Sequence, residues 1–171
     1  MDNNFYQERF ESALAACRDA SPASSTKPAD PALLFFAGPV LGAIAFKVYK
    51  AEWASEPHEP LTSPGRIFFS VWVTEKSIQQ NQLLYNIHAL KLRQFKTHRI
   101  TSRDFAARFR ALLEPYQRDW PNISLDFGPL TLMQGWAPLD PDTLVADIKN
   151  LVQKFEKLSP LIDRMLGEYR L

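Results

Sequence analysis

The sequence predicts an α+β domain in which an antiparallel sheet of about four strands is covered by helices. Two observations predict this class: the order of helix and strand patterns along the chain, and the lack of a glycine-rich turn after any strand pattern. The alternative is an α/β domain with a parallel, doubly wound sheet. With 171 residues, 46% of them apolar and 23% charged, the chain has the composition of one globular domain over residues 1–171.

The chain begins with a helix pattern and a segment of different composition. Apolar residues recur at helical spacing over residues 4–17: Tyr6, Phe10, Ala13, Leu14 and Cys17. Residues 19–30 are rich in serine, alanine and proline, which predicts a flexible loop. Asp-Pro and Gly-Pro pairs then bracket residues 32–37, where a short helix is the first interpretation and a buried strand is the alternative.

Two strands are predicted from alternating side chains over residues 44–51 and 67–73. The proline-rich residues 55–65 form the loop that joins them as an antiparallel pair. This loop holds two acids and a histidine: Glu56, His58 and Glu59. Side chains in a loop lack the fixed spacing of a metal-binding helix, so the sequence predicts no metal ion and no other cofactor.

A pair of helices is predicted over the middle of the chain. Ser77 and Gln80 have the spacing of a capping box, which predicts a helix from about Ile78 with apolar residues on two opposite faces. Such a helix lies between two layers of a domain or supplies an oligomer contact. Thr101 and Asp104 form a similar pair at the start of the next helix, which ends at a Glu-Pro pair.

The last third of the chain predicts two short strands and a long helix. The strands span residues 123–127 and 130–136 around a Gly-Pro turn, with one bulged strand as the alternative. Apolar residues then recur at steps of four and three: Leu144, Ile148, Leu151, Phe155 and Leu158. The predicted helix continues past a Ser-Pro pair, where it kinks or restarts, and it either covers the core or forms a dimer seam.

Positive charge is concentrated between residues 91 and 110. Seven Lys or Arg residues and one acid occur there, although the net charge of the whole chain is only +1. A local positive potential binds phosphates, so four of these residues are candidates for contacts with nucleic acid or another polyanion: Lys96, Arg99, Arg103 and Arg110. Arg108 and Arg110 are expected to be neutralised by acids four residues away, Asp104 and Glu114.

The sequence contains none of the recurrent cofactor-binding or catalytic motifs. An enzyme would need a pocket built from dispersed residues, and three residues are candidates for it: His88, Tyr85 and Asp126. His88 lies among apolar residues, where a hydrogen-bonded structural histidine is commoner than a catalytic base. The sequence therefore favours a non-catalytic protein.

The favoured function is a binding or assembly module that works through protein contacts, either with a partner protein or as a homodimer. Binding of nucleic acid or another polyanion through residues 91–110 is the first alternative, and an enzyme with a pocket near His88 is the second. Cys17 is the single cysteine, which suits a reducing compartment. No secretion signal and no apolar run of spanning length is visible, so a cytoplasmic protein outside the membrane is expected.

Overall fold

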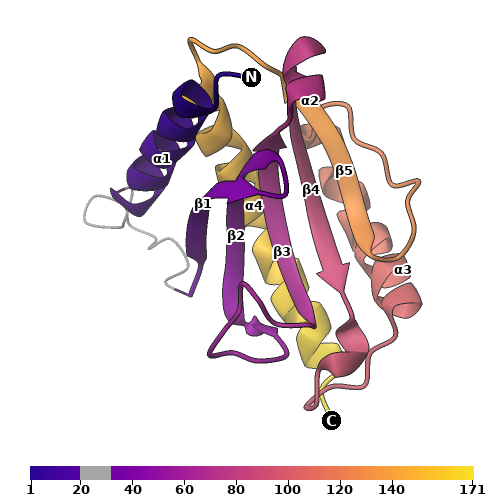
Figure 1. Ribbon diagram of the computed structural model, residues 1–171. Coiled ribbons are helices and arrows are strands. Elements are labelled where there is room, and N and C mark those ends of the chain that lie inside the picture. Colours follow the sequence, from indigo (N-terminus) through magenta and orange to yellow (C-terminus); the bar gives the residue numbers. More distant parts are fainter. Residues whose placement is uncertain (20–31) are drawn as a thin grey trace.

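A five-stranded antiparallel sheet with helices packed on one face forms the fold in the computed structural model, which describes residues 1–19 and 32–171 (Figure 1). The strands lie in the sheet in chain order, so each strand pairs with the next one along the chain. All four pairings are antiparallel. The predicted α+β class is confirmed, with five strands instead of about four, and the parallel alternative is excluded.

The helices and strands have the following bounds. The strands are β1 Leu34–Val40, β2 Ala43–Ala54, β3 Arg66–Val73, β4 Gln82–Leu90 and β5 Thr131–Pro138. The α-helices are α1 Asn3–Asp19, α2 Glu75–Gln79, α3 Ser102–Leu113 and α4 Leu144–Glu168, and two short 3-10 turns are η1 Leu92–Gln94 and η2 Glu114–Asp119. The predictions of α1, α3 and the long C-terminal α4 are confirmed.

Residues 34–40 form the edge strand β1, so the helix favoured for residues 32–37 is wrong and the strand alternative is right. The strand pairs with β2 through a two-residue turn in which Leu41 and Gly42 have φ angles of 47° and 81°. Positive φ at both central residues matches the twist of a tight hairpin, which local apolar spacing does not reveal. The flexible loop predicted for residues 19–30 lies outside the described residues, apart from the end of α1.

Residues 82–90 form the strand β4, so the two-faced helix predicted from residue 78 is wrong. Only the five-residue α2 is helical there, and its capping box joins Thr74 and Ser77, not Ser77 and Gln80. The strand lies between β3 and β5 in the sheet and carries apolar residues on both faces. Leu84 and Leu90 interrupt the otherwise polar open face of β4, which obscures the alternation that marks a strand, and pairing with two neighbouring strands decides the conformation.

Residues 123–127 do not form the regular strand that was predicted. They contribute one isolated bridge, between Ser124 and Gln134, beside the outer edge of β5. The second predicted strand is confirmed as β5. A loop at the edge of a sheet limits pairing with other chains, so this segment protects β5.

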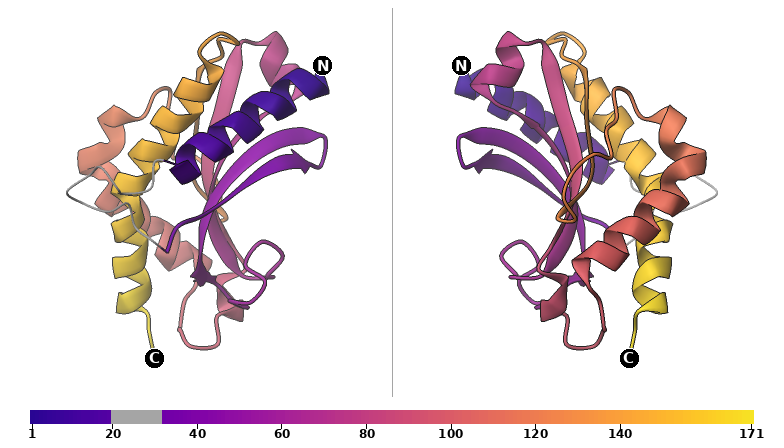
Figure 2. Two further views of the ribbon diagram at one scale, coloured as in Figure 1. Left: turned by 90° about the vertical axis from the view of Figure 1, so that its left-hand side faces the viewer. Right: turned by 90° about the vertical axis from the view of Figure 1, so that its right-hand side faces the viewer.

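The hydrophobic core lies between the sheet and three helices: α1, α3 and α4. Figure 2 shows α3 and α4 on one side of the sheet, while the β1–β2 hairpin bends away from them and α1 lies along this hairpin. Phe155 of α4 stacks on Phe69 of β3 with ring centroids 4.6 Å apart, and Trp120 lies 5.8 Å from Phe69.

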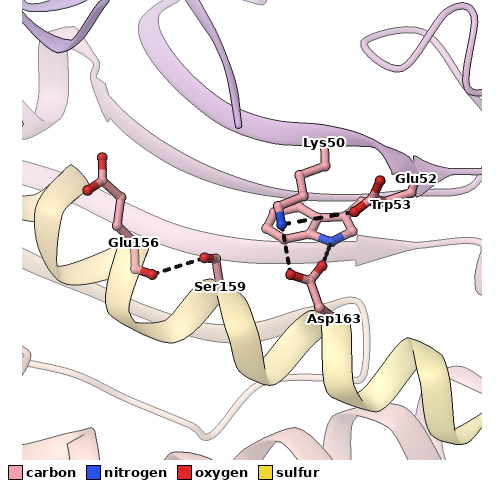
Figure 3. Close-up of polar contacts among 6 residues, drawn as sticks. All are labelled: Lys50, Glu52, Trp53, Glu156, Ser159 and Asp163. Atoms are coloured by element: carbon pink, nitrogen blue, oxygen red, sulfur yellow. Dashed lines mark hydrogen bonds and ion pairs between the residues drawn. The ribbon is translucent and has the colours of Figure 1, made fainter. Parts of the chain in front are cut away.

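Ser159 compensates for a proline inside α4. Pro160 has no N–H to donate to the carbonyl of Glu156, and Oγ of Ser159 donates to this carbonyl at 2.9 Å (Figure 3). The Ser159 side chain is buried. We expect Ser159→Ala to lower the free energy of unfolding in urea by about 1–2 kcal/mol, because the replacement removes a buried hydrogen bond.

The matched control for this prediction is Ser12→Ala. Ser12 makes the same kind of bond, to the carbonyl of Glu8 at 2.9 Å, on the exposed side of the regular helix α1. Alanine favours helix and water can solvate an exposed carbonyl, so this change is expected to alter stability by less than about 0.5 kcal/mol. Equal effects of the two replacements would show that Ser159 has no special role at the proline.

Candidate binding face on the sheet

The face of the sheet turned away from α1, α3 and α4 is here called the open face (Figure 1). Cross-strand pairing arranges its side chains in three rows. The first row is Gly38, Ala45, Trp72, Leu84 and Trp136. The second row is Phe36, Lys47, Ser70, Asn86 and Gln134. The third row is Leu34, Tyr49, Phe68, His88 and Thr131.

One end of the open face is apolar. Trp72 and Trp136 are half-buried, and Leu41 at the tip of the β1–β2 hairpin is fully exposed. Leu41 also has a φ of 47°, a conformation that costs a non-glycine residue about 1 kcal/mol. A large apolar side chain therefore stands in water at a position where the backbone favours glycine or asparagine.

The other end of the open face holds four residues here called the basic cluster: Lys47, Arg66, Phe68 and His88. Nζ of Lys47 lies 4.8 Å and Cζ of Arg66 lies 5.5 Å from the centroid of the Phe68 ring. The His88 ring centroid is 5.3 Å from that of Phe68. Phe68 itself is buried, so the cations and the imidazole cover an aromatic floor.

Asn86 lies beside the basic cluster and is only 2% exposed. Its Nδ2 is 2.8 Å from Nε2 of His88 and donates to Oε1 of Gln134 at 3.5 Å. Over residues 1–19 and 32–171, two buried side-chain atoms have no hydrogen-bond partner, Oδ1 of Asn86 and Nε of Arg66. Both belong to residues of the open face, although more than about 90% of buried polar groups in proteins are paired.

The three catalytic candidates are not assembled around one pocket. Tyr85 points into the core, where its hydroxyl donates to the carbonyl of Pro121 at 2.6 Å and burial raises its pKa. His88 lies on the opposite face of β4, and Asp126 is exposed in the loop before β5. Tyr85 and His88 therefore cannot act on the same substrate atom.

The four polyanion-binding candidates divide into two groups. Lys96, Arg99 and Arg103 are exposed in and after the turn that follows β4. Arg110 donates instead to the carbonyls of Phe127 and Gly128 in the segment before β5, and to those of Thr131 and Leu132 at the start of this strand. Its guanidinium holds this loop on α3, so it is a structural residue.

Arg108 and Arg110 also have partners other than the expected neighbours four residues away. Arg108 forms a two-bond ion pair with Glu168 of α4, with the shorter contact at 3.1 Å, and this pair raises the pKa of Arg108 and lowers that of Glu168. The helices α3 and α4 are therefore joined by charge at the surface. Spacing along the sequence predicted a contact of Arg108 with Asp104 in the same helix. The packing of α3 on α4 instead brings Glu168 to Arg108.

Lys50 is a buried ionic residue that the sequence analysis did not single out (Figure 3). Its Nζ lies 2.7 Å from Oδ2 of Asp163, and Nε1 of Trp53 donates to Oδ1 of the same carboxylate at 2.8 Å. These contacts join β2 to α4. The signal in the sequence is the position of Lys50 in the alternating pattern, because it follows Ile44, Phe46 and Val48 on the core-facing side.

Neither metal binding nor a reactive thiol is supported among the residues that the structure describes. In the part of the chain that the structure describes, no group of three or more His, Cys, Asp or Glu residues is placed to hold a metal ion. Burial and the charge of Glu156 raise the pKa of Cys17 to about 11, although Lys149 opposes this shift, so its thiol stays protonated at neutral pH. None of the helices within the described ranges has both the length and the apolar composition needed to cross a bilayer.

Comparison with known proteins gives no relative: no family model, no curated protein and no solved structure matches this chain at a significant level. The function is therefore argued from the open face and its chemistry.

The position of His88 predicts a pH dependence of stability. Burial lowers its pKa below the ordinary value of 6.5, Lys47 and Arg66 lower it further, and the hydrogen bond to the Leu130 carbonyl opposes the shift. Between the folded-state pKa and 6.5 the unfolded chain binds more protons, so the free energy of unfolding falls as the pH drops through this window. We expect the urea midpoint to fall between about pH 7.5 and about pH 5.

Replacement of His88 by glutamine is expected to reduce the fall of the urea midpoint between about pH 7.5 and about pH 5. The remaining part is expected from His98, whose pKa is also lowered by burial. His58→Gln is the matched control, because His58 is exposed in the loop between β2 and β3. A pH profile that is the same for His88→Gln as for the wild type would contradict the prediction.

Proposed function

We propose that this protein is a non-catalytic binding module whose open face docks a partner protein. The observation that carries the proposal is the row Trp72, Leu84 and Trp136, whose side chains are partly accessible, with the fully exposed Leu41 at the tip of the neighbouring hairpin. The core helices α1, α3 and α4 lie on the other face. Grouped apolar side chains on a surface usually mark an interaction site. Tryptophan is also enriched among the residues that dominate the binding free energy of interfaces.

The charges of the open face favour a different protein over a second copy of this chain. A twofold dimer places the same surface on both subunits. Such a dimer would bury Lys47, Arg66 and His88 against a face whose three rows contain no acid to pair with them, and unpaired buried charges oppose association. The homodimer hypothesis also rested on a helix with two apolar faces, and that segment is the strand β4, which buries one face in the core of its own chain.

The test is capture from the producing cells with immobilised wild-type protein and two variants. Trp72→Ala removes a large side chain from the open face, and Tyr116→Ala removes an exposed aromatic residue from η2, outside the sheet. We expect one protein to be retained by the wild type and by Tyr116→Ala, and its affinity for Trp72→Ala to be about 30-fold weaker. Equal retention by all three, or retention by none, would count against the proposal.

Binding of nucleic acid or another polyanion is the second proposal. It is supported by the position of the turn after β4, where Lys91, Lys96 and Arg99 are exposed next to the end of β3 that carries Arg66. The test is the salt dependence of binding to DNA and RNA, which charge reversal at Arg99 and Arg103 should weaken. No binding at about 50 mM salt would contradict it.

We also propose the cytoplasm as the compartment of this protein. The proposal is supported by the single cysteine of the sequence, since proteins of oxidising compartments often use disulfides. Fractionation of the producing cells tests it, and recovery of the protein outside the cytoplasmic fraction would contradict it.

A further inference from the structure

The basic cluster has features that apolar docking alone does not require. Lys47 and Arg66 lie on the same face of two neighbouring strands and both contact the ring of Phe68. None of the open-face residues in the three rows is an acid. The positive charge of this end of the sheet is therefore not neutralised by the face on which it lies.

Burial and the neighbouring positive charges both lower the pKa values of groups in the basic cluster. Burial lowers the pKa of Lys47, and the charge of Arg66 lowers it further. Lys47 and Arg66 likewise add to the lowering of the pKa of His88. An anion bound among the three would relieve this mutual repulsion and favour their protonated forms.

Hydrogen bonding gives an independent indication of a ligand. Nε of Arg66 is a buried donor without a partner, and Oδ1 of Asn86 is a buried acceptor without a partner. These groups flank Phe68 and His88 on adjacent strands. Unpaired buried groups cost free energy, so two of them on one face indicate that a polar partner completes the site.

We propose that the basic cluster is a subsite for carboxylate side chains of an acidic segment in the partner protein. Lys47 and Arg66 bind the carboxylates, Phe68 supplies an apolar floor, and Oδ1 of Asn86 accepts a hydrogen bond from a backbone N–H of the segment. The inference rests on the proposed function, because it names the chemistry of the partner at the same face. Trp72 and Arg66 are six residues apart on β3, so the apolar and acidic groups of the partner lie about 20 Å apart.

The test uses a capped peptide of consecutive glutamates as the probe and NMR spectra of the isotope-labelled protein as the readout. A glutamine peptide of the same length controls for the backbone, and an oligothymidine of similar length represents single-stranded nucleic acid. We expect the glutamate peptide to shift the amide signals of Lys47, Phe68 and Asn86 and to raise the pKa of His88. The glutamine peptide should cause neither change.

The matched variants are Lys47→Met and Lys157→Met. Methionine keeps most of the apolar volume of lysine, and Lys157 is exposed on α4, in the helical layer. Loss of one paired charge at a partly buried site is expected to weaken the affinity for the glutamate peptide about fivefold in Lys47→Met. Lys157→Met should bind as the wild type does.

The possible results separate this inference from the proposed function. Amide shifts on the open face without a rise in the His88 pKa, and without an effect of Lys47→Met, would overturn the subsite but leave docking on this face intact. Shifts confined to Lys96, Arg99 and Arg103, or tighter binding of oligothymidine than of the glutamate peptide, would overturn the acidic partner. No binding of the glutamate peptide at low salt would also overturn the subsite.

Discussion

Replacing Asp163 with alanine is expected to lower the free energy of unfolding by about 3–5 kcal/mol, because it removes the nearest carboxylate from a buried lysine. The side chain of Lys50 is 3% exposed, and its Nζ lies 2.7 Å from the Asp163 carboxylate. The same replacement takes away the acceptor of the Trp53 indole N–H. The Lys50 ammonium stays out of water while its closest carboxylate is lost, and the exposed Glu52, 4.0 Å from Nζ, compensates only weakly.

Urea unfolding of three variants separates the parts of this effect. Asp163→Asn keeps an oxygen for Trp53 but removes the charge. We therefore expect it to lower the free energy of unfolding by less than Asp163→Ala does. Glu52→Gln is the control, since Glu52 is 63% exposed and 4.0 Å from Nζ of Lys50. Its effect should stay below about 0.5 kcal/mol. A loss of less than about 1 kcal/mol in Asp163→Ala would mean that the pair does not hold α4 on β2.

Replacing Gly135 with alanine is expected to destabilise the protein by about 3 kcal/mol, because the new methyl group has no space. A Cβ at this position would lie 2.5 Å from Cζ of Tyr85, still closer to its hydroxyl, and 2.9 Å from the carbonyl oxygen of Asn122. Tyr85 cannot move freely, since its ring lies 5.0 Å from that of Trp120 and its hydroxyl is bonded to Pro121. Either the ring or the backbone of β5 must shift.

The matched control is Gly128→Ala, because a Cβ there would meet no atom within 4 Å. This change should alter the free energy of unfolding by less than about 0.5 kcal/mol. The cost of Gly135→Ala should also fall by at least about 1 kcal/mol in a Tyr85→Ala background, where the ring is gone. Additive effects of the two replacements would contradict the predicted clash.

The sequence predicted the three long helices and three of the strands, but it also predicted helices where β1 and β4 lie. The three long helices each bury one stripe of a regular pattern, as in α4, where Leu144, Ile148 and Leu151 all lie in the core. The strand β4 was missed because Leu84 and Leu90 give its open face apolar residues as well. Its conformation depends on pairing with β3 and β5, which are distant contacts that spacing along the chain does not encode.

The candidate site was hardly visible in the sequence. The basic residues between 91 and 110 stand out because they are neighbours in the chain, yet Arg110 is used to hold a loop. Lys47 and His88 belong to one cluster only because β2, β3 and β4 lie side by side in register. The alternating pattern did place Lys47 on the side opposite to Phe46, which was the one available signal.

The most direct test of the open face as the binding surface is site-specific photo-crosslinking in the producing cells. A photoreactive residue is placed at Trp72 or Leu84 on the open face, and at Gln153 or Lys157 on the exposed side of α4. We predict one discrete adduct with a different protein from the first two positions and none from the last two. Adducts formed only from α4, or an adduct of this chain with itself from Trp72, would contradict the account.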